Sequence, residues 1–134
     1  MSNKATFRAL REEVGISHAD LAHMMKVHVN SVKRWENPAF TQEPPADAFA
    51  LLNEALEKRN WIIDTFIGRE NIDFENAKEV QINYYRDQDE YDKFGRDKGN
   101  FKIANANARA VARELELEGI TNIEFVYPQE HNQH

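Results

Sequence analysis

The sequence predicts a mainly α protein with a small α+β module at its C-terminal end, and three observations support this prediction. Apolar residues recur at helical spacing to about residue 67. Two short later segments alternate apolar and polar side chains, as strands do. Residues 1–40 carry six Lys and Arg against four Asp and Glu, a net +2, whereas the rest carries 11 against 19, a net −8. We therefore expect an N-terminal helix-turn-helix bundle in residues 1–68 and a strand-helix-strand dimerisation part in residues 69–134.

Composition excludes several classes of protein. The chain of 134 residues has no long apolar run and no basic-then-apolar N-terminus, so we expect no membrane span, no signal peptide and a cytoplasmic location. The lack of cysteine excludes disulfides and cysteine nucleophiles. No nucleophile stands beside a base, and His18, His23 and His28 fall on different helical faces. We expect no enzyme, no cofactor and no metal site.

The first two helices are short and amphipathic. The first covers residues 4–14, with the inward residues Phe7, Leu10 and Val14 and the stop Gly15. The second begins at Ser17, which is a good N-cap because its hydroxyl oxygen accepts a hydrogen bond from the backbone. It points Leu21, Ala22 and Met25 inward, and we expect Val27 in the following turn to pack against both neighbouring helices.

The third helix starts near His28 and has two different faces. It buries Val32 and Trp35. Its outer face carries Val29, Asn30, Lys33 and Arg34. An outer face of amide and cationic groups suits the major groove of DNA, where Asn pairs with adenine and Arg or Lys with guanine. The alternative for the two cations is a solvated helix face without a ligand.

This stretch resembles the Cro/CI-type (XRE) helix-turn-helix family. The matching residues are Leu21-Ala22, Val27, Val32 and Trp35-Glu36. Lys26 and Pro38 stand where that family has glycines, so Lys26 has to accept a tight conformation. The resemblance implies that His18, His28, Val29, Asn30 and Arg34 contact DNA, and the chemistry of the helix start and of the outer face adds Ser17 and Lys33 to the expected interface. For Ser17 a cap alone, and for His18 a plain exposed histidine, are the alternatives to phosphate contact.

A loop and a long helix follow. We expect Phe40 of the loop to pack against the bundle, and Pro45 to lie in the first turn of the fourth helix. This helix extends from Ala46 to about Ile67, is interrupted by Lys58-Arg59-Asn60 and stops at Gly68. Its second half is apolar on more than one face, which predicts a contact beyond the bundle.

The sequence of the C-terminal part predicts two strands with a helix between them. The alternating apolar residues are Val80, Ile82 and Tyr84 in one strand and Ile123, Phe125 and Tyr127 in the other. The helix covers about Phe101 to Glu118 and has the inward residues Ala104, Ala108, Val111, Ala112 and Leu115. A polar stretch with Gly95 and Gly99 precedes it. Because two strands alone are marginal in water, we expect an identical chain to complete the sheet.

This part resembles the anti-CRISPR-associated (Aca) repressors of phages and their bacterial relatives. The residues concerned are Ile82-Asn83-Tyr84-Tyr85, Tyr91, Ala112-Arg113-Glu114-Leu115 and Ile123-Glu124-Phe125-Val126. The resemblance implies a dimerisation domain and repression of the protein's own operon at inverted repeats. We therefore expect a homodimeric transcriptional repressor on palindromic double-stranded DNA.

Two alternatives to this expectation remain. An antitoxin would use the acidic C-terminal half to bind a toxin. An RNA regulator would use the tyrosines and a basic loop, although that loop is more simply read as solvated. Its residues are Lys93, Arg96, Lys98 and Lys102.

Overall fold

The computed structural model describes residues 2–69 and 79–128. These residues form six helices and one two-stranded parallel sheet, which confirms a mainly helical protein with a small β component. The chain divides into two compact units, Met1–Lys58 and Arg59–His134. The division falls inside helix α4 (Ala46–Arg69), whereas the sequence suggested a boundary after residue 68. Among the described helices, none is long and apolar enough to cross a membrane.

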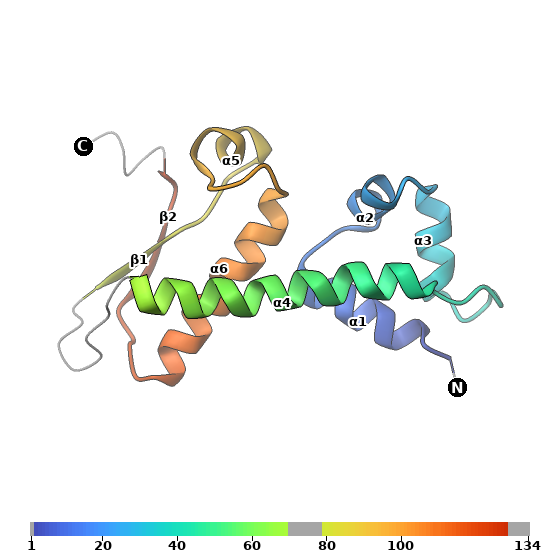
Figure 1. The fold of residues 1–134 in the computed structure, drawn as a ribbon, viewed down its shortest axis with the longest axis horizontal. Coiled ribbons are helices and arrows are strands. Elements are labelled where there is room, and N and C mark those ends of the chain that lie inside the picture. Colours follow the sequence, from blue (N-terminus) through green and yellow to red (C-terminus); the bar gives the residue numbers. More distant parts are fainter. Residues whose placement is uncertain (1, 70–78, 129–134) are drawn as a thin grey trace. The chain divides into compact units, whose positions relative to one another are not determined.

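The first unit contains α1 (Lys4–Val14), α2 (His18–Met25), α3 (Val29–Glu36) and the first part of α4 (Figure 1). Its core is centred on Phe7, whose ring makes edge-on contacts with Trp35 at 5.9 Å and Phe49 at 5.3 Å between centroids. Other fully or nearly buried apolar residues are Val14, Ile16, Leu21, Ala22, Val32, Ala48 and Leu52. The burial of Val32 and Trp35 confirms the predicted inner face of α3.

The first unit also corrects three sequence-based expectations about packing. Leu10 is only half-buried, and Arg11 takes its place in the buried stripe of α1. Val27 and Phe40 are exposed rather than packed against the bundle. Leu10 lies beside the buried stripe of α1 rather than in it, and for Val27 and Phe40 the position of the turn or loop decides the exposure.

Helix α4 is continuous through the predicted interruption at residues 58–60 and includes Gly68. Its first residue, Ala46, directly follows Pro45, whose carbonyl accepts a hydrogen bond from the Ala48 amide at 3.1 Å. The helix continues because Arg59, one of the expected interrupting residues, has a buried partner. Its Nε donates to Asn107 Oδ1 at 2.9 Å within the second unit.

The second unit has the order β1 (Val80–Asn83), α5 (Gln88–Phe94), α6 (Phe101–Leu117) and β2 (Ile123–Val126). The strands are parallel, with Val80 beside Ile123 and Ile82 beside Phe125, and helix α6 belongs to the crossover between them (Figure 1). The buried core residues are Ile82, Ala108, Val111, Ala112, Leu115 and Ile120. Partly buried residues of α4 pack against them: Ile62, Ile63, Phe66 and Ile67.

The second unit departs from the sequence-based expectation in three places. Helix α5 lies within the stretch expected to be a polar loop; Asp87 caps it by accepting from the Glu90 amide at 2.9 Å. Asn105 is buried in α6, because its side chain exchanges two 2.7 Å hydrogen bonds with the Tyr85 backbone. Phe125 and Tyr127 were expected on the inner face of the sheet, yet both are exposed.

Candidate nucleic-acid interface

The turn between α2 and α3 is three residues long and begins in a left-handed conformation. Lys26 has φ 59° and ψ 43°, and its amide donates to the Ala22 and His23 carbonyls at the end of α2. Among the described residues it is the one non-glycine residue with positive φ. The turn therefore has the tight geometry expected of it, with a lysine in place of the usual glycine.

His28 forms the N-cap of α3. Its Nδ1 accepts a hydrogen bond from the Asn30 amide at 3.1 Å, and its carbonyl accepts from the Ser31 amide at 2.9 Å. Because Nδ1 is the acceptor, the ring proton of neutral His28 sits on Nε2. The predicted interface residue His28 is thus a capping residue that keeps one outward donor.

The outer face of α3 is the exposed side of the helix. Asn30, Lys33 and Arg34 are all exposed, and Val29 is half-buried. The three polar residues follow the i, i+3, i+4 spacing, which places them on one face. They lie opposite the two buried anchors Val32 and Trp35.

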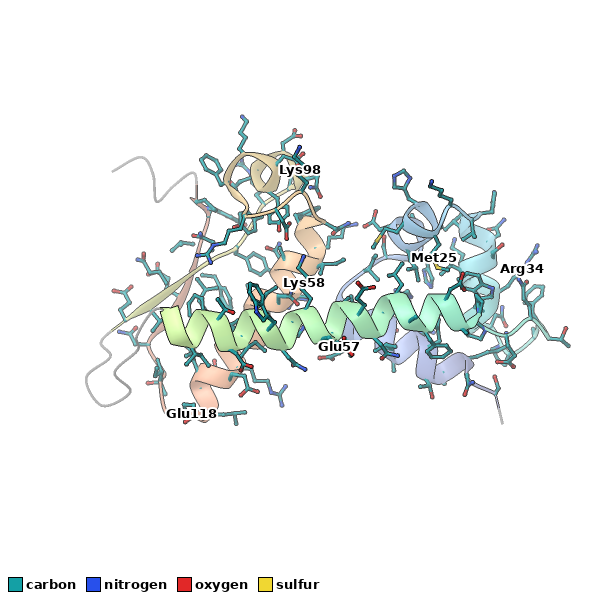
Figure 2. The ribbon with its side chains drawn as sticks, in the orientation of Figure 1. Met25, Arg34, Glu57, Lys58, Lys98 and Glu118 are labelled. Carbon is teal, nitrogen blue, oxygen red and sulfur yellow. The ribbon has the colours of Figure 1, made fainter. Side chains whose placement is uncertain are left out.

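Arg34 lies near the end of α3 that leads into the following loop (Figure 2). Its guanidinium stacks 5.4 Å from the ring centroid of Phe40, which is itself exposed. A cation above an aromatic face is favourable and restricts the arginine without burying it. The loop aromatic that the sequence assigned to the core therefore supports a candidate interface cation.

The end of α3 is fixed by a buried lysine. Lys4 Nζ donates to the carbonyls of Arg34 at 2.8 Å, Trp35 at 3.4 Å and Gln42. The Arg34 and Trp35 carbonyls belong to the last turn of α3, where an α-helix leaves carbonyls without an intrahelical i+4 partner, and a cation there also opposes the helix dipole; the Gln42 carbonyl belongs to the following loop. Lys4 is buried, so this charge serves the fold rather than the surface.

Glu36 holds α1, α2 and α3 together. Its side chain is 6 % exposed and accepts from Arg11 Nε at 2.6 Å and Nη2 at 3.0 Å. His18 Nε2 lies 3.1 Å from Glu36 Oε1, the oxygen that also accepts from Arg11 Nη2. Burial raises the pKa of Glu36, but the hydrogen bonds and charges of Arg11 and His18 lower it more, so its pKa is below the ordinary value.

These contacts change the role of two predicted interface residues. His18 was expected to be exposed or to contact phosphate, but it binds Glu36 and is only 34 % exposed. Ser17 caps α2 by accepting from the Asp20 amide at 3.1 Å, while its hydroxyl proton remains available as a donor. The structure thus gives both residues a structural role.

An open hollow of about 390 Å³ adjoins this surface. Its lining residues are Arg8, His18, Lys33, Glu36, Asn37 and Pro38. Lys33 and His18 therefore meet at one depression, although His18 is already bonded to Glu36. Arg8 is exposed and paired with Glu12 at 2.7 Å, so a phosphate in the hollow would compete with a weak surface ion pair.

Sequence reasoning missed the supporting residues Lys4, Arg11 and Glu36. Lys4, Phe7, Arg11 and Val14 form the buried stripe of α1, so helical periodicity contained the signal. The two cations were counted as surface charge because of their residue type. With both buried, four of the six basic residues in the first 40 remain exposed: Arg8, Lys26, Lys33 and Arg34.

Comparison with known proteins does not assign this surface. No protein-family model matches the chain, and a search of the curated proteins returns no match. The class of protein therefore has to be inferred from the geometry of the site. Helix α3 is short, and the apolar pair Val32 and Trp35, the buried Arg11–Glu36 ion pair and the buried Lys4 hold it in place. Its free face presents one amide and two cations to a polar partner.

Proposed function

We propose that this protein is a helix-turn-helix transcriptional repressor that binds double-stranded DNA as a homodimer, with α3 in the major groove. The exposed set Asn30, Lys33 and Arg34 on a helix anchored from its opposite face carries this proposal. A reading helix needs free polar groups at known positions and no freedom to rotate. The contacts of Lys4 and Glu36 supply that restraint.

Each residue of the outer face has a defined chemical role in the proposal. The Asn30 amide can donate to and accept from one adenine edge at the same time. Arg34 can pair with guanine through two donors, and Lys33 supplies a charge for guanine or phosphate. Each good base contact contributes roughly 1–3 kcal/mol of discrimination against the wrong base.

The start of α2 and the start of α3 supply backbone-facing donors. The Ser17 hydroxyl and His28 Nε2 each keep a proton that is not used in their capping bonds. Phosphate oxygens accept such donors and so fix the position of the protein on the duplex. His18 acts here by holding Glu36, and its role is positioning.

Dimerisation supplies the affinity that one copy lacks. Four exposed cations in the first 40 residues make few phosphate contacts, and the chain as a whole has a net charge of −6. Two linked copies bind adjacent half-sites with a high effective concentration. Their reading helices would then lie about 34–36 Å apart, one turn of DNA, on an inverted repeat.

Selection of bound duplexes from a random DNA pool tests this function. The full chain is expected to enrich an inverted repeat whose half-site centres are about 10–10.5 base pairs, or a multiple, apart. Unlinked single half-sites would contradict the dimer. Failure to enrich any sequence would contradict DNA reading and would favour a protein-binding role such as that of an antitoxin.

A further inference from the structure

The outer edge of β2 carries unused backbone hydrogen-bonding groups. Along the β1–β2 ladder, the Val80 amide donates to the Asn122 carbonyl at 3.0 Å and the Tyr84 amide to the Val126 carbonyl at 2.9 Å. Successive residues of a strand direct these groups to opposite edges, so the amides and carbonyls of Ile123 and Phe125 point away from β1. Within the described residues, no strand pairs with this edge.

The apolar face of the sheet is also incomplete at β2. Ile82 and Phe125 are neighbours in the ladder and point to the same side, yet Ile82 is 5 % exposed and Phe125 is 43 % exposed. The core of α6 and α4 covers Ile82 and also contacts Ile123 of β2, but it leaves Phe125 open. Phe125 makes an edge-on contact with Tyr84, at 5.4 Å between centroids, and its other side faces solvent.

This edge has only part of the usual protection against strand pairing. Edge strands of soluble proteins are commonly very short, or carry charged side chains (above all lysine), proline or a bulge. Strand β2 is short and carries Glu124, but it has no lysine, proline or bulge. Ile123–Val126 has the sequence Ile-Glu-Phe-Val, and its pairing with β1 is regular. One additional strand would both form hydrogen bonds with the outward amides and carbonyls of β2 and cover Phe125.

We infer that β2 of a second copy of this chain pairs antiparallel with this edge, with Phe125 opposite the partner's Phe125. This inference rests on the proposed homodimer and specifies its interface. The result is a four-stranded sheet that continues from one protomer into the other. A strand facing its own copy across a two-fold axis is necessarily antiparallel, and its contacts are self-complementary.

Several registers of the β2–β2 pair keep the side chains on the correct face of the sheet. The sequence of β2 favours one of them. A two-fold axis at Glu124 would place two carboxylates directly opposite each other, at the closest cross-strand distance. An axis at Val126 would pair only three residues of the segment 123–127. An axis at Phe125 pairs all five residues, with Glu124 opposite Val126 and Ile123 opposite Tyr127.

A first experiment tests the edge through the mass of the full-length protein in solution. Wild type is expected to be a dimer, and Phe125→Lys a monomer at the same concentration, because two lysines would face each other at the axis. Leu117→Lys is the matched control, since Leu117 is an apolar residue of the same unit and is 74 % exposed. A dimeric Phe125→Lys, or a monomeric wild type, would overturn the inference.

A second experiment tests the register and keeps Phe125 in place. The chain has no cysteine, so Ile123→Cys and Tyr127→Cys variants each carry one thiol. After co-expression and oxidation, the mixture is expected to form disulfide-linked dimers, because opposite residues lie about 5.5 Å apart between Cα atoms. Each variant alone should not cross-link, since its two thiols would lie four residues apart along the strands. Cross-linking within one variant, or none in the mixture, would overturn the register.

Neither experiment contains DNA, so the inference and the proposed function can fail separately. A β2-paired dimer that enriches no DNA sequence would retain the interface and reject DNA reading. A DNA-binding dimer in which Phe125→Lys stays dimeric would retain the function and reject this interface.

Discussion

At the scale of single residues, Glu36 does more for the site than the residues that face outward. Its buried carboxylate joins Arg11 and His18, so one side chain fixes α3 against α1 and α2. Such a pair is costly to break, because the remaining partner stays buried without its counter-charge. The position of α3 is therefore fixed by a buried carboxylate rather than by its outward-facing residues.

Glu36→Gln tests this role through stability and its pH dependence. At pH 7 the variant should lose about 3–5 kcal/mol of unfolding free energy, because Arg11 is left buried without a counter-charge. Since the pKa of Glu36 is lowered in the folded state, its stabilisation is present above the unfolded pKa and is lost as the pH falls through the folded pKa. The difference in Tm between wild type and variant should shrink between pH 5 and pH 3. A difference independent of pH would show that Glu36 is not ionised in the fold.

Replacement of Lys26 by glycine is expected to have the opposite effect, a gain in stability. A lysine in the left-handed region carries a backbone cost of about 1–2 kcal/mol that glycine does not have. Lys26→Gly should therefore raise the denaturant midpoint by an amount equivalent to about 1 kcal/mol. Lys33→Gly is the matched control, and inside α3 it should lower stability by about 1 kcal/mol. Equal effects of the two substitutions would contradict the strain at Lys26.

At the scale of elements, a glycine permits the packing of α5. A Cβ at Gly95 would lie 2.5 Å from both Cε2 and the carbonyl oxygen of Tyr91. Tyr91 is buried against Tyr85, with 4.7 Å between ring centroids, so it has little room to move. Gly95→Ala should cost about 1–3 kcal/mol by overpacking, measured by thermal unfolding.

Gly99 supplies the control for this substitution. A Cβ there would meet Asp97 Oδ1 at 2.9 Å, the end of a side chain that can rotate away at the cost of its hydrogen bonds with Tyr91 Oη and the Gly99 amide, whereas the Tyr91 carbonyl at Gly95 is backbone. Gly99→Ala should therefore cost less than Gly95→Ala. If the two substitutions cost the same, the contact with Tyr91 does not limit the packing of α5.

The sequence predicted those elements whose signals are local. Periodicity and Gly15 defined α1, whose cap has φ 89°, and periodicity also separated the two faces of α3. Helix α5 was missed because it is seven residues long and its clearest signal is the Asp87 cap. Predicting the continuity of α4 required a partner 48 positions away, because Asn107 accepts from Arg59.

The candidate site likewise has some features that the local sequence predicts and others that depend on distant residues. The exposure of Asn30, Lys33 and Arg34 follows from helical spacing and is local. The bond between His18 and Glu36 depends on how two helices cross, which spacing within either helix does not encode. A basic residue is also a poor guide to surface charge when its partners are distant, as Lys4 and Arg11 show.

At the scale of the whole molecule, the stability of the proposed dimer should depend on pH, because acidic side chains lie together on one face of the sheet. Glu124 raises the pKa of Glu79 through a side-chain hydrogen bond and its negative charge. Pairing through β2 would bring a second such pair of carboxylates close, raise the pKa of Glu79 further and so take up protons. The dimer should tighten as the pH falls from 7 to 5, and Glu124→Gln should tighten it at pH 7 and reduce the pH effect. Sedimentation of both proteins across this range measures the change, and a wild-type dimer that loosens in acid would contradict the account.

The outer face of α3 is proposed to read bases, and the affinity of Asn30→Ala for the selected operator tests this role most directly. Equilibrium titration should be made with wild type, Asn30→Ala and Asn53→Ala, an exposed asparagine of α4 that serves as control. Each is measured on the operator and on operators with one adenine replaced. The account predicts a roughly 10- to 100-fold higher Kd for Asn30→Ala, with lost preference at one adenine in each half-site, and an unchanged Kd for Asn53→Ala. An Asn30→Ala protein that binds like wild type and keeps every base preference would contradict it.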